Sequence, residues 1–213
     1  MFTITPMVVA IGPQREKSRF TYMHNFGDKV DIPYVSWLLE GDGRRILVDA
    51  GCSAADYRER IRGEGPLMLA GETFQDVVDV KPIEEHFAER GLSFDDIDTF
   101  VQTHLDWDHC MNTTKFRRSK ILIQRNEWTQ IPVHPLFAST YAPKEHYEEI
   151  ARLNVEFVEG DYELAKGTYK VIPTGMHMDP ILTYDSMLRI LDVGKDKVLP
   201  FHDIAVLELE TIG

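Results

Sequence analysis

Two apolar runs joined by a tight turn constrain the first half of the chain more than any other feature. Tyr34–Leu39 and Ile46–Asp49 flank a Gly-Asp-Gly sequence at 41–43, and an Asp-Gly pair between apolar runs is typical of a β-hairpin. The second run leads into Asp49-Ala50-Gly51, a turn that carries a carboxylate. The sequence therefore predicts two antiparallel strands with an acidic residue at the end of the second.

Further along the chain, predicted strands alternate with predicted helices. Pro82–Arg90 is predicted to be a helix, because proline suits the first turn and Gly91 fits the position just after the last turn. Residues 53–80 are predicted to form a loop with a short helix. The remaining predicted strands are 99–103, 120–124, 155–158, 169–172 and 197–200, and the remaining predicted helices are 144–153 and 179–191. This alternation indicates an α/β fold, and no repeat or linker divides residues 1–213 into more than one domain.

The net charge and the cysteine count of the chain indicate which partners and which cellular compartment to expect. The 213 residues include 23 Lys and Arg against 35 Asp and Glu, a formal net charge of −12, which disfavours nucleic acid or an anionic membrane as a partner. Cys52 and Cys110 are too few for a disulfide framework and fit a reducing compartment. With neither a secretory signal nor a transmembrane span in the sequence, we expect a cytoplasmic protein.

The strongest chemical signal is a group of two histidines and two carboxylates within six positions, His104 to His109. Side chains alternate along extended chain, so His104, Asp106 and Asp108 point the same way after the predicted strand 99–103. Imidazole and carboxylate groups are ligands for zinc, iron and manganese, and two ions about 3.5–4 Å apart can activate a shared water. The alternative is a surface turn in which acids and histidines happen to meet, but the apolar residues around the group argue against it.

The segment His104-Leu105-Asp106-Trp107-Asp108-His109 resembles the His-x-His-x-Asp-His signature of the metallo-β-lactamase superfamily. The surrounding sequence is most similar to the N-acyl-homoserine lactonase-like branch of that family. Asp49-Ala50-Gly51 matches the family's strand that ends in Asp-x-Gly, and residues 198–203 resemble its late Pro-Gly-His-Asp motif. The resemblance extends over roughly residues 30 to 205.

This resemblance implies an αββα sandwich with metal ions at one edge, between the two sheets. It implies that His104, Asp106 and a histidine from the middle of the chain bind a first ion. It implies that Asp108, His109 and His202 bind a second ion, and that Asp49 supports the site by hydrogen bonding. Asp108 would also be catalytic, because its carboxylate can hand a proton to the leaving group.

The sequence departs from the family pattern at two places. Asp106 replaces the usual second histidine, and a harder carboxylate ligand favours iron or manganese relative to zinc. The middle motif begins at Val171 and brings His177 to the ligand position, but only 24 residues separate His177 from His202. Asp192 is the nearest formal candidate for the carboxylate that bridges the two ions in the family. In an alternative alignment the middle histidine and the bridging carboxylate are both deleted, and His177 is an ordinary loop histidine.

The short interval between His177 and His202 also predicts a shortened second sheet. Strands lost from that sheet would uncover core that a second copy of the chain could cover, so we expect a homodimer.

The leading hypothesis for function is a metal-dependent hydrolase that uses a metal-activated water. Its substrate would be a small molecule, a lactone or other small ester such as an N-acyl-homoserine lactone. One or two zinc ions per chain are the expected cofactors, with iron or manganese as alternatives. Two other hypotheses remain open: a catalytically impaired binding protein, suggested by the missing middle region, and an iron-dependent redox protein, suggested by Asp106.

Overall fold

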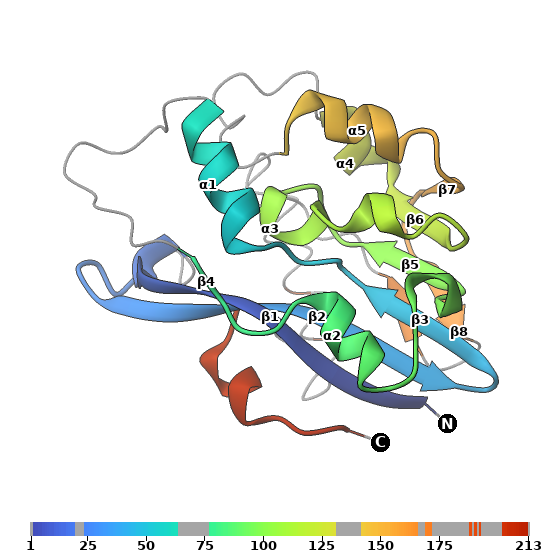
Figure 1. The fold of residues 1–213 in the computed structure, drawn as a ribbon, viewed down its shortest axis with the longest axis horizontal. Helices are drawn as coiled ribbons and strands as arrows, with labels where there is room; N and C mark the ends of the chain where they lie inside the picture. The colour runs from blue at the N-terminus through green and yellow to red at the C-terminus, as the bar shows by residue number, and fades with distance from the viewer. Residues whose placement is uncertain are drawn as a thin grey trace.

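A seven-stranded mixed sheet, in the order β4-β1-β2-β3-β5-β6-β7, forms the centre of the computed structural model (Figure 1). The structure describes residues 2–19, 24–63, 77–130, 142–165, 169–171, 188, 190, 192 and 202–212. A separate two-stranded sheet pairs β8 with β9. The strands are β1 (Phe2–Glu16), β2 (Lys29–Gly41), β3 (Arg44–Val48), β4 (Val78–Asp79), β5 (Thr99–Gln102), β6 (Lys120–Gln124), β7 (Val155–Val158), β8 (Tyr162–Ala165) and β9 (Tyr169–Val171).

The direction of the strands determines where the functional residues gather. β1 is antiparallel to β2, and β2 is antiparallel to β3. Leu39 pairs with Ile46 across the predicted hairpin, which is therefore confirmed. β3, β5, β6 and β7 run parallel to one another. Parallel strands end at the same edge of the sheet, where ligands of α/β proteins usually bind. The residues after β3 and β5 therefore meet at one edge.

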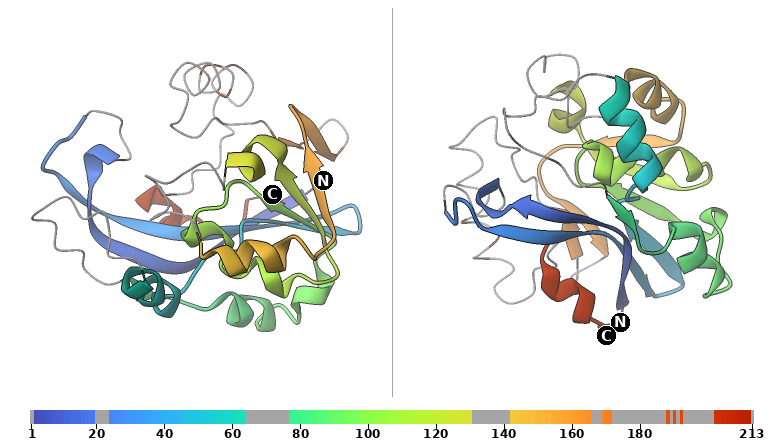
Figure 2. Two further views of the ribbon diagram at one scale, coloured as in Figure 1. Left: turned by 90° about the horizontal axis from the view of Figure 1, so that it is seen from above. Right: turned by 60° about the vertical axis from the view of Figure 1, so that its left-hand side comes forward.

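Side chains alternate between the two faces of the sheet and fill two separate cores. On β2, Leu38 packs into the core on the helical face, whereas Trp37 and Leu39 pack into the core on the other face. The described α-helices lie on the first face, and Leu164 of β8 and Val206 of the 3₁₀-helix η5 cover the second (Figure 2). The helices are α1 (Ala54–Gly63), α2 (Ile83–Ala88), α3 (Trp107–Cys110), α4 (Arg125–Gln130), α5 (Lys144–Ile150) and the 3₁₀-helices η1 (Lys17–Arg19), η2 (Phe94–Asp96), η3 (Thr113–Lys115) and η5 (Ile204–Glu208).

The predicted α/β class is confirmed, and the described residues supply a helical layer and two sheets of the predicted αββα sandwich. The helix predicted over 179–191 lies mostly outside the described residues, and the strand predicted over 197–200 lies wholly outside them. Within the described part of the chain, the second sheet consists of β8 and β9. No helix of that part is long and apolar enough to cross a membrane.

The longest strand, β1, was not predicted from the sequence. Pro6 and Pro13 interrupt its apolar pattern, and proline cannot donate a hydrogen bond within a sheet. β1 tolerates both, because β4 pairs with it only at Ala10 and Ile11 and because Pro13 lies in a β-bulge, where the register with β2 shifts. β8 and α4 were also not predicted: β8 follows the Gly-Asp turn at 160–161 and pairs with β9, so β7 and β9 belong to different sheets.

Gly51, just after β3, is a position where an added methyl group should be costly. Its φ angle is +65°, and a β-carbon there would lie 2.6 Å from Cγ2 of Val9. Gly43 in the hairpin turn has a similar φ of +72° but no atom within 4 Å of the corresponding position. Gly51→Ala is therefore expected to lower the free energy of unfolding by about 1–3 kcal/mol more than Gly43→Ala. Urea denaturation of both variants measures the difference, and equal losses would contradict the predicted clash.

Candidate metal centre

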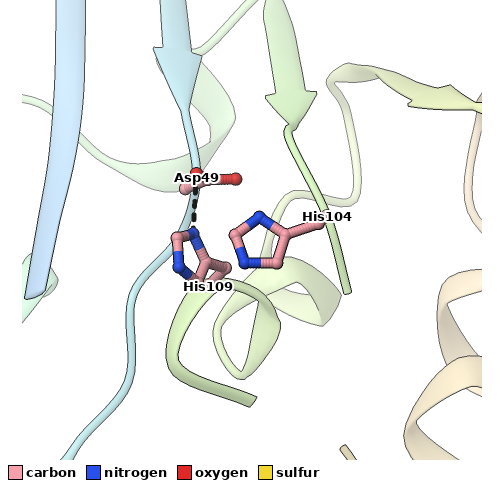
Figure 3. A group of neighbouring side chains, drawn as sticks. All are labelled: Asp49, His104 and His109. Atoms are coloured by element: carbon pink, nitrogen blue, oxygen red, sulfur yellow. Dashed lines mark hydrogen bonds and ion pairs between the residues drawn. The ribbon is translucent and has the colours of Figure 1, made fainter. Parts of the chain in front are cut away.

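The predicted site residues meet at the edge where β3 and β5 end. Asp49 follows β3, and His104 and His109 follow β5, with His109 on the short helix α3 (Figure 3). Two backbone hydrogen bonds tie these segments together: Asp49 N–H donates to the carbonyl of Val101 at 2.9 Å, and Ala50 N–H donates to the carbonyl of His109 at 2.9 Å. Asp49 itself has a left-handed backbone, with φ of +59°, a strained conformation that is common at functional sites.

The carboxylate of Asp49 is fully buried and accepts hydrogen bonds from three residues. Thr103 donates its backbone N–H at 2.8 Å and its hydroxyl at 2.6 Å, Gln102 donates its amide at 3.0 Å, and His109 donates Nδ1–H at 2.9 Å. Burial raises the pKa of Asp49 to about 6, and the electrostatic effect of the nearby His104 and the hydrogen bonds from Thr103 oppose that rise. With its oxygens so occupied, Asp49 is suited to orient neighbouring groups rather than to bind an ion.

Hydrogen bonds determine which nitrogen of each site histidine carries the proton. His109 donates Nδ1–H to Asp49, and the Thr103 hydroxyl, which itself donates to Asp49, accepts from Nδ1 of His104 at 2.9 Å. His202 donates Nδ1–H to the carbonyl of Pro33 at 3.0 Å. Each ring therefore keeps its lone pair at Nε2. Burial lowers the pKa of His109 to about 3, so this imidazole is neutral at pH 7.

These lone pairs lie next to the two predicted carboxylates. Nε2 of His109 and Nε2 of His202 are each 3.5 Å from Oδ2 of Asp108, and one ligand atom of each residue lies within 4.8 Å of the others. Nε2 of His104 is 3.7 Å from Oδ2 of Asp106, and the ring centroids of His104 and His109 are 3.7 Å apart. The structure thus brings six of the seven predicted site residues into one cluster.

The two other candidates from the sequence are His177 and Asp192. His177 lies outside the described residues. Asp192 is exposed, and among the described residues it belongs to neither of the two groups of three side chains that could hold an ion.

Several residues that shape the site were not predicted from the sequence. Gln102 is almost fully buried in β5, where its amide donates to Asp49 and to the carbonyl of His104, and its own carbonyl accepts from the hydroxyl of Thr113. Glu127 on α4 accepts the backbone N–H of Leu105 at 2.9 Å. A polar glutamine inside an otherwise buried strand is the signal that could have identified Gln102.

The donor set fits a divalent transition-metal ion. His109 and His202 offer two imidazole nitrogens and Asp108 offers a carboxylate oxygen, all of them donors that zinc, iron and manganese accept. The second nitrogen of a metal-binding histidine usually donates to a carboxylate or a backbone carbonyl. His109 and His202 show one case of each, with Asp49 and with Pro33.

Comparisons with known proteins give a matching family model and several similar proteins. The family model of the metallo-beta-lactamase superfamily matches residues 31–199. N-acyl homoserine lactonases of Bacillus sp. and Bacillus cereus are 26% identical over 149 and 151 residues, which cover 66% and 70% of this chain and 53% and 56% of theirs. The chain therefore spans about half the length of these curated relatives.

Solved structures resemble this chain over nearly all of it. A mutant of AiiA from B. thuringiensis with N-decanoyl-L-homoserine bound at its active site has a TM-score of 0.70 at 20% identity, over 97% of this chain and 95% of its own. An N-acyl homoserine lactone hydrolase with N-hexanoyl-L-homoserine bound at its catalytic metal centre has a TM-score of 0.72 at 20% identity, over 97% and 94%. At these identities the likeness shows the fold alone.

Proposed function

This chain belongs to the metallo-β-lactamase superfamily, and we propose that it is a metal-dependent hydrolase that acts on a lactone or another small ester. The observation that carries the proposal is the convergence of two Nε2 lone pairs, from His109 and His202, on the carboxylate of Asp108. In both histidines Nδ1–H donates to a protein oxygen while Nε2 faces the carboxylate of Asp108, which is the usual arrangement of metal-binding histidines.

In this proposal Asp108, His109 and His202 hold one ion, and His104 and Asp106 contribute to a second, with His177 as the further ligand expected from the sequence. Zinc is the expected metal, and the carboxylate of Asp106 makes iron or manganese a closer competitor than a histidine would. When bound, such ions supply Lewis acidity, which lowers the pKa of a water and polarises the carbonyl oxygen of the substrate.

The residues of the chain then orient the donors and move the proton. Asp49 holds His109 with Nε2 toward Asp108, and Thr103 links Asp49 to His104, so both rings are fixed from one point. The carboxylate of Asp108 can take a proton from the attacking water and give it to the alkoxide oxygen that leaves the acyl carbon. In a lactone that oxygen stays attached, so the product is a hydroxy acid.

The relatives indicate which substrate to try first. The curated relatives are N-acyl homoserine lactonases, and two similar structures hold an N-acyl-L-homoserine. An N-acyl-homoserine lactone is therefore the first candidate, followed by simple lactones and aryl esters.

The test combines metal analysis with turnover. We expect about one or two ions per chain by elemental analysis of fresh protein, loss of lactone hydrolysis after treatment with a chelator, and its return with added zinc, iron or manganese. Protein that is fully loaded with metal but turns over no lactone or ester would contradict the proposal. Protein that takes up no metal would favour a catalytically impaired binding protein.

Asp106 favours a second candidate function, an iron-dependent redox protein. A carboxylate beside His104 makes that part of the site harder than a pair of histidines would. Iron in the purified protein, with colour that changes on reduction and no esterase activity, would support this candidate. Zinc with esterase activity would exclude it.

A further inference from the structure

We infer that Arg15 and Tyr34 form a positioning pair that fixes the imidazole of His202 beside Asp108. The inference rests on the proposed function, since it concerns the affinity of the site for an ion. Arg15 lies on β1, Tyr34 lies on β2, and His202 comes from the far end of the described chain.

Tyr34 packs directly against His202. Its side chain is 3% exposed, and its ring centroid is 5.6 Å from that of His202 with an interplanar angle of 83°. The residue before it, Pro33, accepts the Nδ1–H of His202 through its carbonyl. Consecutive residues of β2 therefore fix the position of the ring and the location of its proton, which leaves Nε2 directed toward Asp108.

Tyr34 is in turn fixed by Arg15. The guanidinium of Arg15 donates a hydrogen bond to the phenol of Tyr34 and lies 5.3 Å from the ring centroid of Tyr57 on α1. Arg15 is only 8% exposed although it is charged. Burial raises the pKa of Tyr34, the neighbouring charge of Asp108 adds to that rise, and Arg15 opposes it, so Tyr34 lies between the two charges as a neutral phenol.

A β-bulge directs Arg15 toward this position. Gly12 pairs with Ile32 and Arg15 pairs with Val30, so two residues of β1 lie opposite one residue of β2. Gln14 within the bulge has a φ of +53°, and its N–H and its side-chain amide both donate to Asp31, at 2.8 and 3.1 Å. Bulges often redirect a side chain next to a functional site.

Gly12 leaves the space that this pair occupies. A β-carbon at Gly12 would lie 2.6 Å from the hydroxyl oxygen of Tyr34 and 2.9 Å from Nε of Arg15. The bulge directs Arg15 toward Tyr34, and the missing side chain at Gly12 leaves room for the contact between them.

The sign of the change in metal affinity separates positioning from simple electrostatics. If Arg15 acted on the ion only through its charge, its removal would strengthen the binding of a divalent cation, since like charges repel. If Arg15 and Tyr34 hold His202 in place, their removal weakens binding, by about 10-fold or more as for other groups that orient metal ligands. We expect weaker binding.

The experiment measures the affinity of the whole protein for Zn²⁺ by competition with a chromophoric chelator, and the absorption spectrum of the Co²⁺ form. Arg15→Met removes the guanidinium, and Tyr34→Phe removes only the hydroxyl that accepts from it, so at least one variant keeps the packing of the native fold. His202→Ala serves as the reference for loss of the ligand. Arg44→Met is the matched control, because Arg44 donates to the carbonyl of Leu164, away from the site.

We expect both test variants to bind one Zn²⁺ about 10-fold more weakly and to change the Co²⁺ spectrum in the same direction as His202→Ala, while Arg44→Met binds like the wild type. Unchanged or stronger binding in both variants, or equal weakening in the control, would overturn the inference and leave the proposed function standing. A wild-type protein that binds neither metal would overturn both.

Discussion

Replacing Asp108 by asparagine is expected to lower kcat/KM for lactone hydrolysis by about 10²–10⁴-fold. Oδ2 of Asp108 is 3.5 Å from Nε2 of both His109 and His202, so the substitution removes the carboxylate between the two imidazole nitrogens. It also removes the group proposed to carry the proton to the leaving oxygen. Asparagine has nearly the same size, so the fold is expected to persist.

Steady-state kinetics and elemental analysis of the same preparations measure this effect. Asp95→Asn is the matched control, because Asp95 forms an exposed ion pair with Arg118 at the protein surface. Normal kcat/KM in Asp108→Asn, at full metal content, would show that Asp108 has no part in the chemistry.

Replacing Asp49 by alanine is expected to have the largest effect on stability, a loss of about 3–5 kcal/mol in the free energy of unfolding. The carboxylate is fully buried, and its removal strands donors from Gln102, Thr103 and His109 in the protein interior. Because Asp49 also orients His109, the same variant is expected to bind metal about 10–100-fold more weakly.

Urea denaturation of metal-free protein measures the loss in the free energy of unfolding separately from the loss in metal affinity. Asp98→Ala is the control, since Asp98 is exposed and its side chain accepts the backbone N–H of Arg45. A loss in Asp49→Ala no greater than that in Asp98→Ala would mean that water replaces the buried carboxylate at little cost.

The parts of the site that depend on local spacing could be predicted, and the parts that depend on tertiary contacts could not. His104 to His109 are close in sequence, so short spacing alone brings their side chains near one another, although the expected extended chain gives way to the helix α3 at Trp107–Cys110. His202 was identified only through a family motif, because no local pattern relates it to Pro33, 169 residues away. Gln102 looked like an ordinary strand residue, since its partners Asp49 and Thr113 come from other segments.

In the fold, too, elements with a local sequence signal could be predicted, whereas those that depend on tertiary contacts could not. The hairpin of β2 and β3 carries its own turn signal, whereas β1 is stabilised by its long pairing with β2, which overrides two prolines. Arg15 reaches the site only because a bulge shifts the register of that pairing. Asp106 was recognised as a substitution from sequence alone, and its consequence for the choice of metal remains a prediction.

The hydrogen bond between His202 and Pro33 also has a consequence for the order of folding. Closing a loop of this length carries an entropic cost that grows with the logarithm of the number of residues, so the contact forms late unless other contacts have already brought its ends together. His109 and Asp108 can be placed as soon as β3 and β5 pair, but the third donor arrives only when the last described segment docks. An ion bound to all three donors would therefore bind only after this last segment has docked; it would link the segment to α3 and stabilise the native state by mass action.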